Sequence, residues 1–220
     1  MGSLLPQFTE DQRHPDHIAE VIETTSVEFL AQCLESDNLS FPIMPAFGSW
    51  VKSFDVETNN KIYGIVCYVT TTPIDSVHRA RALGLSLTEL REQQPQIFAM
   101  LKTEFRAVIV GFESSSNQRN GTSLGQVYQY LPPRPPQIHQ GVYRCQEAEI
   151  IHFSENLDFL RILLQVTGIP ADALIAAIIR HIYQLRKGDR DWLIKAGRTL
   201  NNLLQDDYDS LQYIFKQIHL

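Results

Sequence analysis

Side chains able to do nucleophilic or metal chemistry gather most closely between positions 139 and 152. His139, Cys145 and His152 lie there with Glu147 and Glu149. A Cys–His pair can activate a thiolate, and Cys and His are common zinc ligands. Their spacing matches no standard site, and neighbouring residues of a strand point to opposite faces. We therefore expect ordinary strand and loop residues, and we assign no catalytic, cofactor-binding or metal-binding residue in this chain.

Two other polar segments admit both a functional and a structural interpretation. His14 and His17 flank Asp16. A metal site needs more ligands on a fixed scaffold, so we expect residues 1–16 to be a flexible, solvated leader. Residues 132–136 contain a PxxP-like pattern that a groove in a partner could recognise. A stiff spacer between strands is the favoured interpretation.

Arginines near two tyrosines raise the question of single-stranded nucleic acid, which binds basic and aromatic side chains together. The residues are Arg79, Arg81, Arg91 and Arg106 with Tyr63 and Tyr68. Glu89, Glu92 and Glu104 interleave with these arginines, and the chain as a whole carries a net charge of -6. A solvated, mixed-charge face is therefore favoured, and nucleic acid is the less favoured partner.

The composition is that of a globular protein, with 44% hydrophobic and 20% charged residues among 220. The three cysteines, Cys33, Cys67 and Cys145, form no CxxC motif and are odd in number, which favours a reducing compartment. No secretory signal is visible, and the longest clean apolar run, residues 174–179, is far shorter than the roughly 20 residues that span a bilayer. We expect a cytoplasmic protein without a membrane span.

Alternation of apolar and polar residues, with β-branched side chains, dominates the chain up to residue 153. It predicts strands at 17–34, 50–54, 61–71, 104–112, 127–131 and 138–145. Gly64 inside the third of these predicts a bulge or a sharp bend. Ser86 with Glu89 predicts a capping box for a short helix over residues 87–94.

A polar stretch over residues 113–123 contains Asn120-Gly121, which is typical of a hairpin turn. From Ser154 the apolar residues recur with a helical period, which predicts a bundle of about four helices up to residue 220. The expected boundaries are Gly168, Pro170, Gly188, Asp189 or Asp191, and Asp206 or Asp207. Trp192 is expected to pack in the core of this bundle rather than to serve as an interface anchor.

Several short segments of the strand-rich part resemble the HAS barrel, the small β-barrel at the amino end of HerA-type DNA translocases and of ATP synthase catalytic-type subunits. The segments are IAEVIETTSVEF at 18–29, FGSWV at 47–51, YGIV at 63–66, KTEFRA at 102–107 with VGF at 110–112, and PPRPP at 132–136 before Ile138-His139. The resemblance covers roughly two-thirds of the chain and implies a small antiparallel barrel.

The sequence departs from the translocases in one respect. Their barrel precedes a P-loop ATPase core, whose GxxxxGK[ST] motif holds phosphates through backbone N–H groups and a lysine. No glycine in these 220 residues is followed by a lysine. The resemblance therefore implies a barrel without its motor, with a role in assembly or partner contacts instead of catalysis.

The predicted fold class is α+β: a small antiparallel, Greek-key-like barrel over 17–153, with an inserted short helix and a polar hairpin loop, and a helical bundle over 154–220. The predicted function is that of a non-enzymatic assembly or adaptor protein. It would bind a protein partner, either an ATPase ring or a second copy of itself, through barrel or helical surfaces. Two alternatives stay open: an accessory factor in DNA processing related to HerA-type translocases, and an enzyme of unrecognised chemistry.

Overall fold

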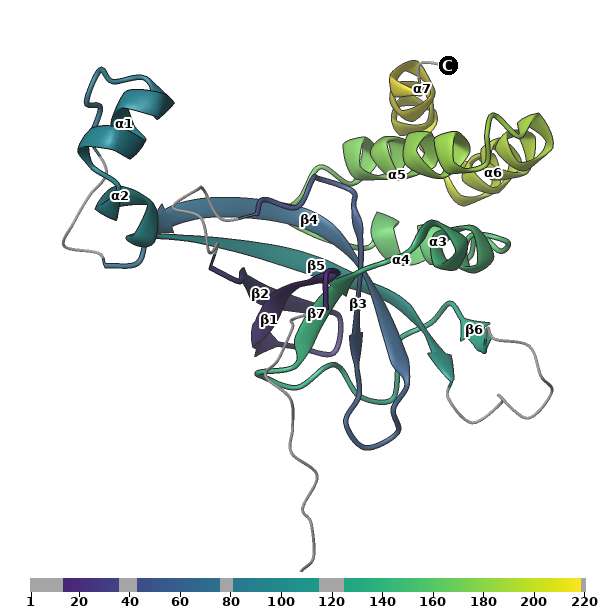
Figure 1. The fold of residues 1–220 in the computed structure, drawn as a ribbon. Coiled ribbons are helices and arrows are strands. Elements are labelled where there is room, and N and C mark those ends of the chain that lie inside the picture. Colours follow the sequence, from purple (N-terminus) through teal and green to yellow (C-terminus); the bar gives the residue numbers. More distant parts are fainter. Residues whose placement is uncertain (1–13, 36–42, 76–80, 115–124, 219–220) are drawn as a thin grey trace, which may run out of the picture.

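The computed structural model describes residues 14–35, 43–75, 81–114 and 125–218. Six strands of this part form a closed antiparallel β-barrel (Figure 1). They are β1 His17–Thr24, β2 Glu28–Cys33, β3 Trp50–Phe54, β4 Lys61–Pro73, β5 Leu101–Ser114 and β7 Gly141–Arg144. The order is β1-β7-β3-β4-β5-β2, and β2 pairs with β1 as well as with β5, which closes the ring. The predicted fold class and barrel are confirmed.

Apolar side chains fill the inside of the barrel. Phe29 and Ala31 of β2 lie opposite Ala107 and Phe105 of β5, and all four are at most 1% exposed. Alternate residues of a strand point to the same side, so these pairs repeat around the barrel. The interior cluster comprises Ile18, Ala19, Val21, Phe29, Ala31, Cys33, Val51, Ile62, Val66, Phe105, Ala107, Ile109, Phe112 and Val142. The barrel interior is therefore a packed core and not a channel.

The central segments of β4 and β5 are buried on their outer face too. Tyr63 and Ile65 of β4, with Val108 and Val110 of β5, are at most 1% exposed. They belong to a second apolar cluster, which includes Trp50 of β3 and residues of the helices that follow the barrel. Burial on both faces explains the nearly continuous apolar runs in these two strands, because a strand with one solvated face alternates.

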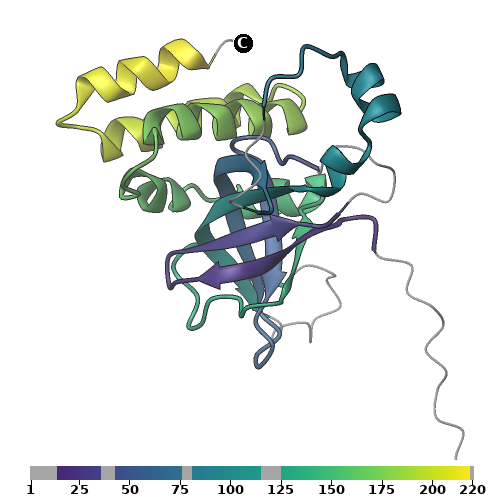
Figure 2. The ribbon, with the colours of Figure 1, turned by 90° about the vertical axis from the view of Figure 1, so that its left-hand side faces the viewer.

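Five helices follow the barrel in the described part of the chain (Figures 1 and 2). They are α3 Glu147–Phe153, α4 Phe159–Leu164, α5 Ala171–Leu185, α6 Arg190–Leu203 and α7 Tyr208–Gln217. α4 lies against β5, α5 lies on α3 and α4, and α6 and α7 lie against α5. The predicted caps at Asp189 and Asp207 are confirmed, because each carboxylate accepts hydrogen bonds from backbone N–H groups of the first helical turn.

The far ends of β4 and β5 extend beyond the body as a two-stranded arm that carries α1 Leu87–Gln93 and α2 Gln96–Ala99 (Figure 1). We use the term arm for residues 69–75 and 81–103. The predicted capping box begins α1: the Glu89 N–H donates to Ser86 Oγ at 3.3 Å, and the Ser86 N–H donates to Glu89 Oε2 at 2.8 Å. No residue of α1 is buried.

The amino-terminal strand prediction was wrong in one respect. Residues 17–34 form a hairpin, β1 and β2, instead of one continuous strand. Thr25 makes the turn, since its Oγ1 accepts a hydrogen bond from the Glu28 N–H at 3.1 Å. Val27 consequently lies in the turn and is 48% exposed, although it falls within the continuous strand predicted over residues 17–34.

The helical part also differs from the prediction, because its first helix begins at Glu147 instead of Ser154. Gln146 and Glu149 form the capping box of α3, which has seven residues. Two turns are too few for a helical period to stand out in a sequence. Pro170 occupies the N-cap of α5 and not its first helical position. Residues 1–13, most of the predicted leader, and Asn120-Gly121 lie outside the described residues.

The remaining strands agree with the prediction, with shifted ends. The register between β4 and β5 is irregular at Tyr63/Gly64, which confirms the predicted bulge. The strand predicted at 127–131 is the short β6 Gln126–Tyr128, which pairs with the end of β5 outside the closed ring. The strand predicted at 138–145 is β7, which has four residues.

We predict that Gly111→Ala destabilises the fold by at least about 2 kcal/mol, as overpacking does in a filled core. A Cβ at Gly111 would lie 2.2 Å from the Tyr128 carbonyl oxygen and 3.0 Å from the Phe153 ring. Urea unfolding measures the effect. Gly197→Ala is the control, because a Cβ there meets only the Phe215 ring at 3.7 Å. Equal unfolding midpoints for Gly111→Ala and the wild type would contradict the packing described here.

Candidate functional site

The residues that could do catalytic or metal chemistry do not form one site in the structure. His139 is exposed, and its Nδ1 lies 3.9 Å from a carboxylate oxygen of Glu20. His152 Nε2 lies 3.3 Å from the Gly125 carbonyl oxygen. Cys145 follows β7 directly. Across the described ranges, no three His, Cys, Asp or Glu side chains are arranged to hold a metal ion.

Both histidine rings near the amino end lie against Tyr143, and the His14 ring meets it edge-on with 6.1 Å between centroids. His14 Nδ1 lies 3.9 Å from Asp16 Oδ2 on the surface. His17 belongs to β1, and its ring stacks on Tyr143 with 4.9 Å between centroids. The two rings therefore serve local packing of β1 against β7.

Sequence reasoning missed a row of four charged side chains between the barrel and α3. Lys52 Nζ of β3 lies 2.7 Å from Glu149 Oε2, and Lys61 Nζ of β4 lies 3.0 Å from Glu149 Oε1. Lys61 Nζ also lies 3.1 Å from Glu113 Oε2 of β5, which accepts a hydrogen bond from the Tyr63 hydroxyl at 2.7 Å. No side chain of Lys52, Lys61, Glu113 and Glu149, called the charge cluster below, is more than 20% exposed.

Glu149 holds its charge through several contacts. Burial alone would raise the pKa of this carboxyl, but hydrogen bonds from Lys52 and from the Gln146 N–H, together with Lys61, hold it below its ordinary value. Glu149 therefore caps its own helix and pairs with two strands of the barrel at once. This geometry ties α3 to the barrel wall.

Glu113 and Lys61 stabilise each other's charged forms. Burial would raise the pKa of Glu113, but the Tyr63 hydroxyl, the Gly125 N–H and Lys61 lower it overall. Burial would lower the pKa of Lys61, but Glu149 and Glu113 raise it overall. A carboxyl with a lowered pKa and a lysine with a raised pKa are poor proton-transfer catalysts near pH 7, because their pKa values lie far from the working pH. The charge cluster is therefore suited to holding the structure together.

Burial also raises the pKa values of the three thiols. It raises the pKa of Cys33 to about 12 and that of Cys67 to about 11. The pKa of Cys145 is raised well above its ordinary value by burial and then by the nearby Glu149 charge. Since the thiolate is the reactive form, none of these environments favours nucleophilic chemistry.

The structure separates the residues of the suspected nucleic-acid surface. Tyr63 is fully buried. The Arg106 guanidinium lies 5.6 Å from the centroid of the exposed Tyr68 ring, and its Nη1 lies 3.7 Å from Glu28 Oε1. Arg81 and Arg91 lie on the arm, whereas Arg79 is outside the described residues. This arrangement favours the mixed-charge interpretation.

Trp192 is 5% exposed, as expected for a core residue. Its indole N–H donates to the Ser154 carbonyl oxygen at 2.9 Å, and the Arg186 guanidinium lies 5.3 Å from the ring centroid. The predicted core packing is confirmed, and the hydrogen-bond partner is the turn between α3 and α4.

The proline-rich connector runs between β6 and β7. Pro132 and Pro136 are buried, and Arg134 pairs with Glu57. A segment anchored in this way is a spacer between strands and is not free to fill a groove in a partner.

A groove of about 790 Å³ lies between the barrel and α4. Its lining includes Glu28, Arg106, Tyr130, Asp158, Arg161 and Ile162. Gln129 fixes its floor, because the side-chain amide donates to the Phe153 carbonyl and its oxygen accepts from the Phe159 N–H. Two acids balance two arginines in a partly apolar lining. Such a surface suits polypeptide contacts better than phosphate binding, which needs an excess of positive charge.

The closed six-stranded barrel with helices packed on its outer wall defines a small barrel domain. The family model of the HAS barrel domain matches residues 18–113. This segment of the chain is therefore similar to a HAS barrel domain, and the match covers β1 to β5 with the arm. β7 and the five helices that follow it lie beyond the matched segment. No curated protein matches this chain. None of the helices in the described part is long and apolar enough to cross a membrane.

We predict that Glu149→Gln lowers the free energy of unfolding by about 3 kcal/mol, because it leaves the two lysines buried without this carboxylate. Glu147→Gln is the matched control, since Glu147 lies exposed on the same helix; it should change stability by less than about 0.5 kcal/mol. Denaturant unfolding compares the two variants. Similar losses would contradict the assigned role of Glu149.

The lowered pKa values of Glu113 and Glu149 predict an acid-sensitive fold. On unfolding, both carboxyls return towards the ordinary value of 4.5. Their contribution to stability is complete above that value and is lost as the pH falls through the lower folded-state values. Denaturant unfolding from about pH 7 down to about pH 3 should show this loss in the wild type and a smaller loss in Glu149→Gln. An identical pH dependence in both would rule out the contribution of Glu149.

Proposed function

We propose that this protein is a non-enzymatic assembly or adaptor protein that binds protein partners through surfaces outside the barrel interior. HAS barrel domains are protein-interaction and assembly domains in HerA-type translocases and ATP synthases. The match of residues 18–113 to that domain supports the proposal.

The arm is the observation that carries the proposal. Ile74, Leu83, Leu87 and Met100 are between 38% and 54% exposed on it. α1 stands clear of the rest of the molecule in two perpendicular views (Figures 1 and 2). An isolated helix of this length is marginal in water, since most helical stability comes from packing of an apolar face. A protein docked on the arm would supply that packing and would bury the exposed apolar side chains.

The buried charged groups and thiols also support a function at the outer surfaces. The carboxylates of the charge cluster are paired with lysines, and the three thiols have raised pKa values. The barrel holds packed side chains in place of a ligand. These groups are committed to structure, which leaves the outer surfaces to carry the function.

We predict that Leu87→Asp strongly weakens partner capture while Thr88→Asp does not. Both changes place a carboxylate in the first turn of α1, where the helix dipole favours it, but only Leu87 contributes an exposed apolar side chain. The full chain is used to capture proteins from the cells of origin, and partners are quantified by mass spectrometry. Wild type and Thr88→Asp should retain the same stoichiometric partner, and Leu87→Asp should lose at least about tenfold, equivalent to about 1.4 kcal/mol.

Two results would count against the proposal. One is a wild-type chain that retains no stoichiometric protein partner. The other is a Leu87→Asp chain that retains the partner as well as the wild type does. Circular dichroism of both variants checks that α1 and the barrel are folded.

A further inference from the structure

A second exposed apolar surface lies far from the arm, between α5, α6 and α7. It is a groove of about 270 Å³ whose lining residues are all apolar or glycine. Ile179 and Leu200 form a buried floor, whereas Ile194 is 52% and Phe215 is 43% exposed. We call this surface the α5–α7 groove. It lies outside the segment that the HAS barrel model matches.

A glycine in the middle of α6 gives the α5–α7 groove its depth. Gly197 lines the groove, and a Cβ there would meet only the Phe215 ring, at 3.7 to 3.8 Å. That is an ordinary van der Waals contact, so packing does not require glycine. A glycine in a helix interior costs about 1 kcal/mol relative to alanine. Residues that break a local rule without a packing reason are expected at functional sites.

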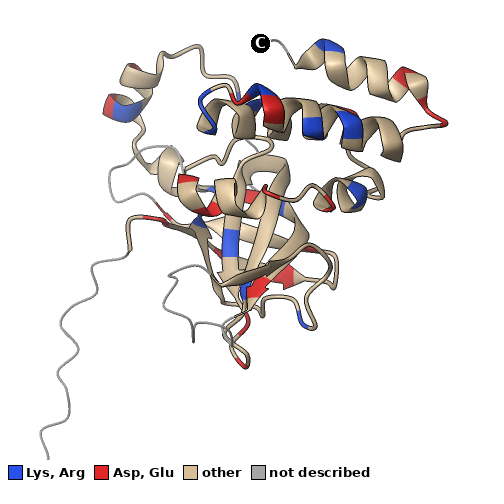
Figure 3. Ribbon diagram, turned by 90° about the vertical axis from the view of Figure 1, so that its right-hand side faces the viewer, with Lys and Arg blue, Asp and Glu red and all other residues tan. Residues whose placement is uncertain are grey.

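The edges of the α5–α7 groove are basic. Arg190, Ile194 and Arg198 follow at intervals of four along α6, so they form one row beside the groove. Lys216 lies next to Phe215 on α7, and both arginines are exposed. Figure 3 shows the charged positions from this side of the molecule. The chain as a whole carries a net charge of -6. The row of Arg190, Ile194 and Arg198 is therefore more basic than the chain as a whole.

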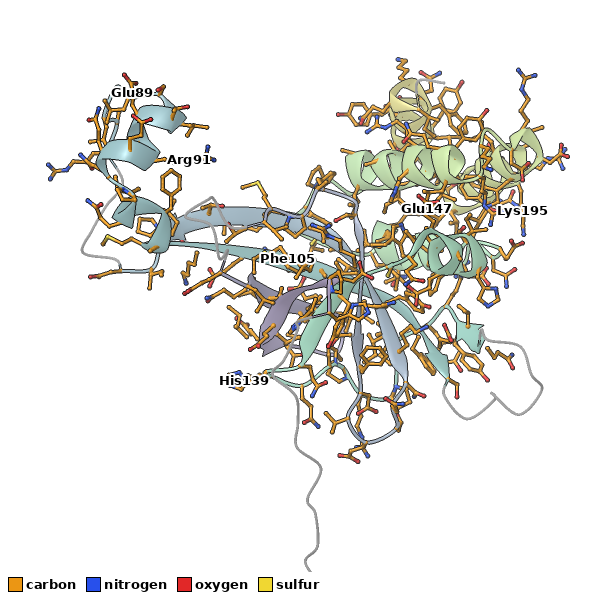
Figure 4. All side chains as sticks on the ribbon, in the orientation of Figure 1. Glu89, Arg91, Phe105, His139, Glu147 and Lys195 are labelled. Carbon is orange, nitrogen blue, oxygen red and sulfur yellow. The ribbon has the colours of Figure 1, made fainter. Side chains whose placement is uncertain are left out.

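Other charges of these helices point elsewhere or lie at the helix ends. Lys195, labelled on α6 in Figure 4, donates to the Glu155 carbonyl oxygen. The acidic residues Asp191 and Asp209 lie in the first turns of α6 and α7, and Arg190 shares that first turn with Asp191, so the basic excess of the border rests on Arg198 and Lys216. The middle of the groove is therefore apolar with a basic border.

We propose that the α5–α7 groove binds an amphipathic helix of a protein partner, with apolar anchors on one face and acidic residues beside them. This inference rests on the proposed function and names the surface and the chemical class of partner. Grooves of this kind take apolar anchors at positions i, i+3 or i+4, and i+7 of a helix. Acidic flanks would pair with Arg190 and Arg198, and would speed association at low salt.

A second copy of this chain fits the α5–α7 groove less well. Its exposed apolar side chains on helices include Ile194 and Phe215, which belong to the groove itself and would bring the basic borders of two copies together. On the arm the exposed apolar helix residue is Leu87 of α1, and Arg91 lies four residues further on the same face. Figure 4 shows Arg91 and Glu89 on the arm, at the opposite side from α6. Docking of α1 would place Arg91 near the basic border, and like charges disfavour such a pairing.

The test uses three labelled synthetic helices and the full chain, with fluorescence anisotropy as the readout. One peptide has leucines at i, i+3 and i+7 flanked by glutamates; the second has lysines in place of the glutamates; the third has the sequence of residues 83–94. We expect the acidic peptide to bind the wild type most tightly. Gly197→Leu should weaken it at least about tenfold by filling the groove, and Arg190→Glu with Arg198→Glu should transfer the preference to the basic peptide.

Three results would overturn the inference: no binding of the acidic peptide, equal binding of the acidic and basic peptides, or unchanged binding by Gly197→Leu. Tighter binding of the 83–94 peptide would make a second copy the occupant and would also overturn it. Gly197→Ala controls for helix stability, and urea unfolding shows that Gly197→Leu is folded. Leu87→Asp should bind the acidic peptide as the wild type does, so capture through the arm can fail or succeed independently of the groove.

Discussion

Burial of the β4–β5 ribbon on both faces is the constraint on which the rest of the molecule depends. On its inner face, Phe105 and Ala107 pack in the barrel core. On its outer face, Tyr63 and Val108 pack in the core beneath the helices. The charge cluster lies at one end of this ribbon, where Lys61 and Glu113 pair across the two strands. The arm lies at the other end. One pair of strands therefore positions the barrel, the helices and the arm together.

Two exposed surfaces follow from this arrangement. The arm extends from the ribbon on one side, and α5, α6 and α7 lie at the other side (Figure 1). These three helices line the α5–α7 groove. The barrel and α3 between them are held by buried apolar contacts and by the charge cluster. The proposed adaptor role would use the two surfaces separately, because each lies on its own side of this centre.

Local signals made most of the elements predictable from the sequence. Helix starts were predicted from Ser86 with Glu89, from Asp189 and from Asp207, because a cap acts within a few residues. Non-local contacts were not predictable. Lys52, Lys61, Glu113 and Glu149 are separated by up to 97 residues, and only the closed barrel brings them together. The helix α3 was not predicted because its two turns are too short for a helical period to stand out. The sequence did not single out Gly197 either, because only the structure shows that a Cβ there would meet the Phe215 ring alone.

Native-state hydrogen exchange tests the dependence on the β4–β5 ribbon most directly. If the barrel and the helices share one core, the slowest amides of β4, β5 and α5 exchange with the same free energy of opening and respond equally to denaturant. The account predicts this common value. Exchange of α5 at a much lower free energy, with β4 and β5 still fully protected, would show that the helices unfold independently of the ribbon and would contradict it.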